Sequence, residues 1–326
     1  MSYRVGMTSP PATPLSDPRE PAPPAPAAAG ASALVEDLPS LSPSRAADFK
    51  TCPLLYRFRV IDRLPETPSL EQVRGTLVHA VLEQLFDLPA PDRTRQAAGD
   101  LVTPQWRRLR TAQPELAEVV PPEQEQEFLA AVAPLLDGYF RVEDPRRLEP
   151  DQRESLIEVV VDQPAAGPVR PRGDTGQRRL KLRGYVDRLD VSPAGDLRVV
   201  DYKTGGAPRE AFEGRALFQL KFYALVLWRL RGRVPRVLRL LYLRDAEACD
   251  YTPEPGELVR FERTLFALWR AIETATAARD FRPNPGRLCG WCAHQQLCPS
   301  FGGTPPPFPE PAAAADTPVP GVAHGD

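Results

Sequence analysis

The chain has 326 residues, of which 42% are hydrophobic and 26% are charged, with 40 prolines, five cysteines and a formal net charge of −2. This length can hold one large domain or two small ones. The longest apolar runs, such as 222–228, are too short to span a bilayer, and the N-terminus lacks the apolar segment of a signal peptide. We therefore expect a cytoplasmic protein with no membrane partner.

The two ends of the sequence differ from its centre. Residues 1–40 carry nine prolines and residues 303–326 carry seven, among mostly Ala, Gly, Ser and acidic residues. Such segments bury too little apolar surface to offset the entropy of ordering. We expect disordered tails at 1–39 and 303–326 and one folded domain at 40–302, which has a net positive charge. Its basic stretch 170–183 is either a solvated loop or a phosphate-binding patch.

The first predicted elements are helical. Ser42 followed by Pro43 is a typical start for a short helix that runs to about Lys50. Thr51-Cys52-Pro53 interrupts it, and an aromatic helical segment follows at 54–58. Ser69 begins a second helix at 69–87, in which His79 lies just off the apolar stripe. By itself, a histidine at such a position is most often an ordinary half-buried residue.

The central part of the chain changes character near residue 155. Residues 90–150 are helix-rich and resemble a helical insertion. Three strands are then expected, followed by a helix, a fourth strand and a last helix. Their predicted ranges are 156–161, 180–191, 197–203, 209–231, 236–243 and 255–279. This order indicates an α/β fold with a mixed sheet and helices on its faces.

The second and third of these strands form a predicted hairpin that carries acidic residues. Asp187 lies in the first strand and an Asp201-Tyr202-Lys203 triplet ends the second. Side chains alternate along a strand, so Asp201 and Lys203 share a face and Tyr202 lies on the other. Two carboxylates and an ammonium together suit a divalent cation and a phosphate. Only four of the 41 basic residues are lysines, which makes Lys203 notable.

The next predicted helix carries Gln219 and Tyr223, which share a helical face at i and i+4. They are either polar breaks in a buried helix or parts of the site.

The cysteines are concentrated near the C-terminus. Cys289, Cys292 and Cys298 lie within ten residues, and Cys-x2-Cys is a common metal-binding spacing. Cys52, Cys249 or His294 can supply a fourth ligand, although Cys249 lies in a predicted acidic loop without a neighbouring chelator. From spacing alone, zinc, an iron–sulfur cluster and no metal all remain open.

Taken together, these motifs resemble RecB-type nucleases of the PD-(D/E)xK superfamily over most of 41–300. Gly75-Thr76-Leu77-Val78-His79 is similar to the family's histidine motif, and 184–190 (Gly-Tyr-Val-Asp-Arg-Leu-Asp) to its first acidic motif. Val200–Thr204 resembles the Asp-x-Lys motif, and Gln219-x3-Tyr223 the motif that follows. Leu41–Ser44, Cys52 and Cys289-x2-Cys292-x5-Cys298 resemble the cysteine staple of AddB-like and CRISPR-adaptation nucleases.

The resemblance implies a restriction-endonuclease-like fold and a metal-dependent DNA exonuclease of repair or recombination. His79, Asp187 and Asp201 would bind Mg²⁺ or Mn²⁺, Lys203 would act on the phosphate, and Gln219 and Tyr223 would position the strand or the lysine. Asp190 is expected to be structural, and Glu158 is a possible further acid.

The resemblance also implies that Cys52, Cys289, Cys292 and Cys298 hold a [4Fe–4S] cluster that joins the two ends of the domain. The expected partner is DNA, as single strands or ends. The chain lacks a P-loop motif, so any helicase would be a separate protein. Two alternatives are a non-catalytic DNA-binding or accessory subunit with the same fold and a zinc-stabilised interaction module using His294.

Overall fold

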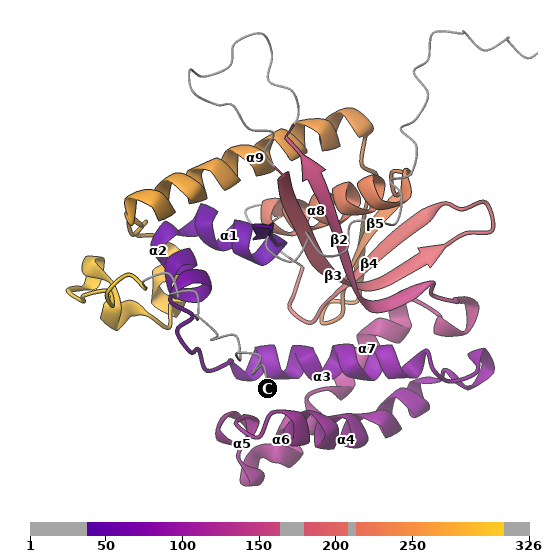
Figure 1. The fold of residues 1–326 in the computed structure, drawn as a ribbon. Helices are drawn as coiled ribbons and strands as arrows, with labels where there is room; N and C mark the ends of the chain where they lie inside the picture. The colour runs from indigo at the N-terminus through magenta and orange to yellow at the C-terminus, as the bar shows by residue number, and fades with distance from the viewer. Residues whose placement is uncertain (1–37, 164–178, 208–212, 310–326) are drawn as a thin grey trace, which may run out of the picture. The chain divides into compact units, whose positions relative to one another are not determined.

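A computed structural model describes residues 38–163, 179–207 and 213–309 (Figure 1). Most of the two predicted tails and most of the basic stretch 170–183 lie outside these ranges, so the predictions for them stay predictions. Within the described part, no helix is both long enough and apolar enough to cross a membrane.

The centre of the domain is a six-stranded mixed sheet, in the order β1-β3-β4-β5-β6 with β2 paired to the other edge of β3. β1–β3 and β4–β5 are parallel pairs, and β2–β3, β3–β4 and β5–β6 are antiparallel. The strands are β1 Ser40–Leu41, β2 Gln152–Asp162, β3 Arg179–Val191, β4 Leu197–Lys203, β5 Val237–Tyr242 and β6 Glu247–Tyr251. The predicted α/β class and the β3–β4 hairpin are confirmed.

Two strands were not predicted. β1 is only two residues long, and β6 is exposed at four of its five positions, two of them acidic. Cys249 therefore lies in β6, opposite Leu240 of β5, and not in a loop as predicted. The strand forms because β5 supplies backbone partners, which outweigh the low strand propensity of acidic residues.

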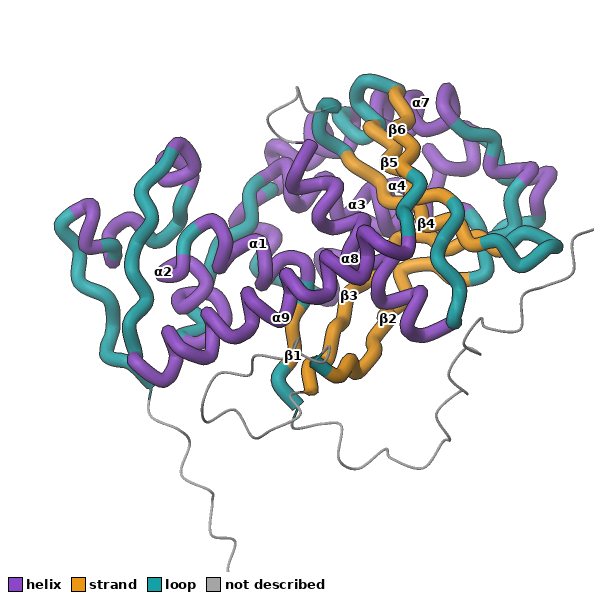
Figure 2. The backbone as a smooth tube through the Cα atoms, turned by 90° about the horizontal axis from the view of Figure 1, so that it is seen from above, coloured by secondary structure: helices purple, strands orange, loops and turns teal. Residues whose placement is uncertain are grey.

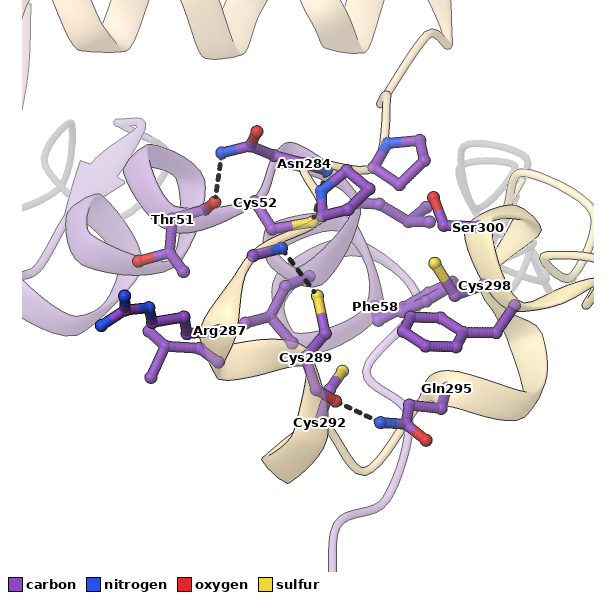
Figure 3. Close-up of a pocket in the computed structure, with 17 residues that line it drawn as sticks. Thr51, Cys52, Phe58, Asn284, Arg287, Cys289, Cys292, Gln295, Cys298 and Ser300 are labelled. Carbon is purple, nitrogen blue, oxygen red and sulfur yellow. Dashed lines mark hydrogen bonds between the residues drawn. The ribbon is translucent and has the colours of Figure 1, made fainter.

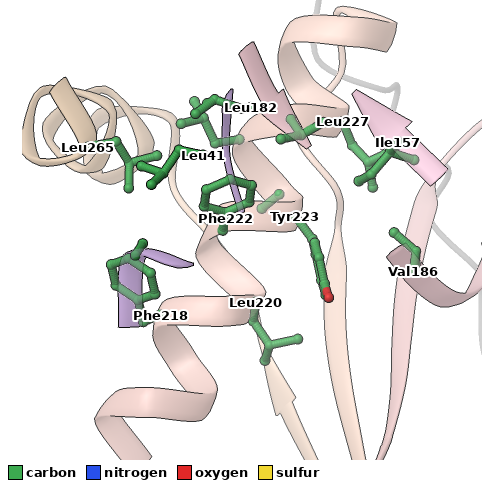
Figure 4. Close-up of a cluster of buried hydrophobic side chains, with 14 of the residues drawn as sticks. Leu41, Ile157, Leu182, Val186, Phe218, Leu220, Phe222, Tyr223, Leu227 and Leu265 are labelled. Atoms are coloured by element: carbon green, nitrogen blue, oxygen red, sulfur yellow. The ribbon is translucent and has the colours of Figure 1, made fainter. Parts of the chain in front are cut away.

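One face of the sheet is covered by α1 Pro43–Thr51, α8 Glu213–Arg231 and α9 Pro255–Ala278, with α2 Pro53–Tyr56 after α1 (Figures 1 and 2). Leu182 and Val186 of β3 pack with Phe222 and Leu227 of α8 in this core (Figure 4). Ser42 caps α1 by accepting a hydrogen bond from the Arg45 backbone N–H, and Cys52 separates α1 from α2, as the sequence predicts.

The other face is covered by the helix predicted at 69–87 and by the helices of the predicted insertion at 90–150. They are α3 Leu70–Leu85, α4 Arg95–Ala112, α5 Leu116–Val119, α6 Glu125–Ala130 and α7 Ala133–Val142. Ser69 and Gln72 form a capping box at the start of α3. Apolar side chains of α3, α4 and α7 pack against Val200 and Tyr202 of β4 in a second core, which fixes α3 against the strand carrying the Asp-x-Lys triplet.

The two strands of the central hairpin separate from each other along one edge of β3. β1 pairs with Lys181 and Leu182, and β4 pairs with 188–191. Between these pairings, residues 183–187 of β3 pair on that edge with neither β1 nor β4. The predicted site residues lie at this fork in the sheet.

The C-terminal segment packs back on the start of the domain. Three 3-10 turns, at 287–291, 295–297 and 299–301, follow α9. Beyond them, the Phe308 ring stacks on Phe281, and Arg57 donates a hydrogen bond to the Pro306 carbonyl. Residues 303–309 therefore have a defined path, although the sequence placed them in a disordered tail, because Phe308 finds an apolar site that composition does not reveal.

Candidate active site at the fork between β3 and β4

The fork brings the two predicted acids together. If the ladder between β3 and β4 continued, it would pair Asp187 with Asp201, but it ends one residue earlier, at Arg188 and Val200. The Tyr202 backbone N–H, left without a partner on β3, donates instead to an Asp187 carboxylate oxygen at 2.7 Å. Asp201 is almost fully buried beside it. The Asp187 carboxylate is thus fixed by the backbone of β4, next to the residue that carries the second acid.

A hydrogen-bonded chain joins the second strand to α8. Lys203 Nζ lies 2.5 Å from an Asp201 oxygen and donates to Gln219 Oε1 at 3.0 Å. The Gln219 amide donates to Asp201 at 3.0 Å and to the Tyr223 hydroxyl at 2.9 Å. The predicted pair Gln219 and Tyr223 therefore contacts the Asp-x-Lys triplet. A Cβ at Gly184 would lie 2.8 Å from the Tyr223 ring, so this close approach needs glycine.

His79 reaches the same fork from α3. A Cβ at Gly75, one turn earlier, would lie 3.2 Å from Thr204 Oγ1, so glycine lets the helix come close to the end of β4. His79 Nε2 lies 3.1 Å from the Tyr202 carbonyl oxygen. A carbonyl only accepts, so Nε2 carries a proton and Nδ1 faces the acids, at 3.6 Å from Asp187. Such an outer hydrogen bond typically orients a metal-binding imidazole.

Sequence reasoning missed one acid of this cluster, Glu154 in β2. Its carboxylate lies 3.2 Å from His79 Nδ1. His79, Glu154 and Asp187 have ligand atoms that all lie within 4.8 Å of one another. Among the described residues, no other group of three or more possible metal ligands is this compact. Glu158, the further acid suggested from the sequence, is instead exposed opposite Arg183.

The backbone explains why Glu154 was missed. The β2–β3 register pairs Arg153 with Arg188 and Ser155 with Val186, so Glu154 is skipped in the ladder. Its φ of 41° lies in the left-handed region, which costs a non-glycine residue about 1–3 kcal/mol. An irregularity of this kind redirects a side chain, and the signal in the sequence is only an acid near the start of a strand.

The charges of the site favour a cation. Burial and the nearby Asp201 carboxylate raise the pKa of Asp187. Burial would lower the pKa of His79, but its hydrogen bond to Glu154 and the charges of Asp187 and Glu154 outweigh this and raise it to about 9. Neighbouring carboxylates oppose each other's ionisation, and a divalent cation bound between them offsets this repulsion. The oxygen and imidazole donors fit Mg²⁺ or Mn²⁺.

Asp190 does not join this cluster. Arg188, fully buried, donates to Asp190 at 3.0 Å, to Glu143 of α7 at 2.7 Å and to the Tyr202 hydroxyl at 2.8 Å. Arg198 also pairs with Asp190. The structure thus places Asp190 in an ion network behind Tyr202, whose backbone contacts both His79 and Asp187.

The four predicted cluster ligands line one cavity of about 200 Å³ between α1–α2 and the C-terminal turns (Figure 3). They are Cys52, Cys289, Cys292 and Cys298. Burial and the nearby thiols of Cys52 and Cys289 raise the pKa of Cys292. No three of the four sulfurs lie within 4.8 Å of one another. The structure therefore gathers the cysteines without forming a compact metal-binding tetrahedron.

The other candidate ligands lie elsewhere. His294 is buried with Nε2 2.6 Å from a Glu66 oxygen and its ring against Phe58, and it does not line the cavity. Cys249 is exposed on β6.

Comparisons with known proteins find similar proteins in two mycobacteriophages and a similar solved structure. The chain is 24% identical over 277 residues to the Gene 69 protein of Mycobacterium phage D29, covering 81% of this chain and 98% of the relative. It is 29% identical over 125 residues to the Gene 69 protein of Mycobacterium phage L5, covering 37% and 41%. A crystal structure described as SSO0001 aligns over 82% of this chain and 89% of that chain, with 13% identity and a TM-score of 0.37.

The model of one protein family matches nearly the whole described domain. Residues 40–299, which include every predicted site residue, match the PD-(D/E)XK nuclease superfamily. This chain therefore belongs to the PD-(D/E)XK nuclease superfamily.

Proposed function

We propose that the fork between β3 and β4 hydrolyses phosphodiester bonds in DNA, as a RecB-like, metal-dependent exonuclease. The observation that carries the proposal is a set of contacts in two parts, joined by the backbone of β4. His79 and the Tyr202 backbone N–H contact Asp187, and Lys203 and Gln219 contact Asp201. A site that had lost its catalytic role would not be expected to keep all its members, which argues against a purely accessory subunit.

Each side chain has a role that its contacts support. Asp187, Asp201, His79 and Glu154 would hold Mg²⁺ or Mn²⁺. When bound, the cation supplies Lewis acidity to the scissile phosphate and the attacking water. Lys203, held by Gln219, places its ammonium where negative charge develops on the phosphate. Gln219 keeps Lys203 and Asp201 in register, and Tyr223 fixes the Gln219 amide.

The cysteine cavity supports a [4Fe–4S] cluster over a single zinc. A tetrahedral zinc with bonds of about 2.3 Å brings its sulfurs within about 3.8 Å of one another. No three cysteine sulfurs of the cavity lie within 4.8 Å of one another, and His294 is engaged with Glu66. A [4Fe–4S] cluster takes four cysteine thiolates as its ligands. Such a cluster would join Cys52 to a segment that lies more than two hundred residues later in the chain.

The test of the nuclease proposal is Lys203→Ala. We expect cleavage of end-labelled single- and double-stranded DNA with Mg²⁺ or Mn²⁺ to fall by a factor of about 10³ or more, as when a transition-state charge partner is removed. The circular dichroism spectrum and DNA binding should be retained. The matched control is Lys221→Ala on the same helix as Gln219, whose ammonium pairs with Glu257. Equal cleavage by wild type and Lys203→Ala would contradict the proposal.

A further inference from the structure

A cleft of about 750 Å³ lies beside the candidate active site, along the open edge of β3. It lies between the start of α1, residues 183–185 of β3 and residues of α8, and Gln219 and Tyr223 form part of its wall. These same residues hydrogen-bond to Asp201 and Lys203. The cleft is therefore continuous with the site, and its volume is within the range of about 300–1,000 Å³ typical of clefts that bind small molecules.

The cleft has an excess of positive charge. Three arginines line it, but Arg59 is neutralised by Asp48 and Glu66. Among the described residues, Arg45 donates only to the Ser40 carbonyl and hydroxyl, so no carboxylate there compensates its charge. The Arg183 side chain has neither an ion pair nor a hydrogen bond to another described residue. Two available guanidinium groups in a cleft favour a ligand with phosphates, which arginine binds through paired N–H donors.

An aromatic side chain lies beside these charges. Tyr185 lies between Arg183 and Asp187 on β3. It is 56% exposed, more than the other tyrosines among the described residues. Among the described residues, the Tyr185 hydroxyl has no hydrogen-bond partner and the ring has no aromatic partner. An exposed ring next to phosphate-binding groups is a typical platform for an unpaired nucleobase. A base inside a duplex presents no free face to such a ring.

We propose that this cleft binds a single-stranded segment of DNA next to the scissile bond, with phosphates at Arg45 and Arg183 and a base stacked on Tyr185. The four residue steps from Arg183 to Asp187 span about 13 Å of strand, which places the contacts a few nucleotides from the acids. The inference rests on the proposed nuclease function. It adds that substrate enters as a single strand, and that a duplex has to open at its end before it reaches the acids.

The experiment measures binding, so that its outcome does not depend on cleavage. The full chain carrying Lys203→Ala is titrated, with Mg²⁺ present, into a fluorescein-labelled oligothymidylate and into a blunt duplex of equal length, and anisotropy is read over a range of salt concentrations. Arg183→Gln is compared with Arg263→Gln on the exposed side of α9, which removes the same charge away from the cleft. Tyr185→Ala is compared with Tyr185→Phe, which keeps the ring.

The two substitutions should act differently. Arg183→Gln should weaken single-strand binding about fivefold near 0.1 M salt and lower the slope of log K against log salt by about 0.7, the value for one lost phosphate contact. Tyr185→Ala should weaken it about fivefold or more without changing the slope, and Tyr185→Phe should bind like the parent. Equal binding within both matched pairs would overturn the proposal, as would losses of equal size on the blunt duplex. If wild type proves inactive while the predicted losses appear, the nuclease proposal fails and the cleft assignment stands.

Discussion

The carboxylate site and the cysteine cavity are both polar centres between distant segments, but their side chains are held in different ways. At the carboxylate site, Asp187 accepts from the Tyr202 backbone and Gln219 bridges Asp201 and Lys203. In the cavity, Cys52 and Cys289 accept only weak hydrogen bonds from backbone N–H groups, at 3.4 and 3.3 Å. The cysteines lie on a helix junction and on short turns, whereas the acids lie on paired strands.

This difference indicates which of the two centres depends on a bound ligand for its geometry. Asp201 lies in the β4–β5 ladder, and Asp187 accepts a hydrogen bond from the Tyr202 backbone N–H. Both acids are therefore held by strand backbone whether or not a cation is bound. Short turns lack such a ladder, so the geometry of the thiols has to come from whatever they bind. We expect the cavity to contribute mainly stability and the fork mainly chemistry.

The largest expected effect on stability therefore comes from the cavity. Cys298→Ser should remove the iron and acid-labile sulfide, about four of each per chain, that we expect in anaerobically purified wild type. The binding free energy of a structural metal centre adds to the free energy of folding, by about 10 kcal/mol or more for zinc sites. The unfolding temperature of Cys298→Ser should therefore fall by more than that of the other variants proposed in this Discussion. Cys249→Ser is the control and should leave the metal content and unfolding temperature unchanged. Wild type containing zinc would contradict the cluster.

A smaller loss is expected at the ion network behind the fork. Arg188→Met leaves Glu143 as a nearly buried acid without its arginine, while Asp190 keeps Arg198; breaking such a buried pair typically costs about 3–5 kcal/mol of unfolding free energy. Arg198→Met removes a second partner of Asp190 that is partly exposed to solvent, so it should cost about 1 kcal/mol or less. Urea unfolding of both variants measures the difference. Similar losses would show that Arg188 does not anchor Tyr202 through buried charge.

The parts of the fold that the sequence revealed are those with a repeating physical rule. Alternation along β4 put Asp201 and Lys203 on one face, helical spacing put Gln219 above Tyr223, and Ser42 and Ser69 marked helix starts; the structure agrees in each case. The family resemblance added His79, which lies at the fork as expected.

The parts that remained hidden depend on contacts between distant residues. β6 exists because β5 offers it an edge, and Arg188 is buried because α7 brings Glu143 over it. Glu154 escaped notice because a break in strand pairing, invisible to a two-residue period, turns its side chain toward His79. The same break holds Glu154 at a positive φ.

Glu154 should matter more for activity than for folding. Glu154→Gln keeps the shape but removes a charged metal-binding oxygen and weakens the interaction with His79. It should lower metal affinity or cleavage by at least the roughly 10–100-fold typical of groups that only orient metal ligands. Glu154→Gly should lower activity at least as much. Because glycine adopts a positive φ without steric cost, it should also keep or raise the unfolding free energy, by about 1 kcal/mol at most. Glu247→Gln, at an exposed strand position of β6, controls for loss of a carboxylate. Full activity of Glu154→Gly would mean that the Glu154 carboxylate does not serve the site.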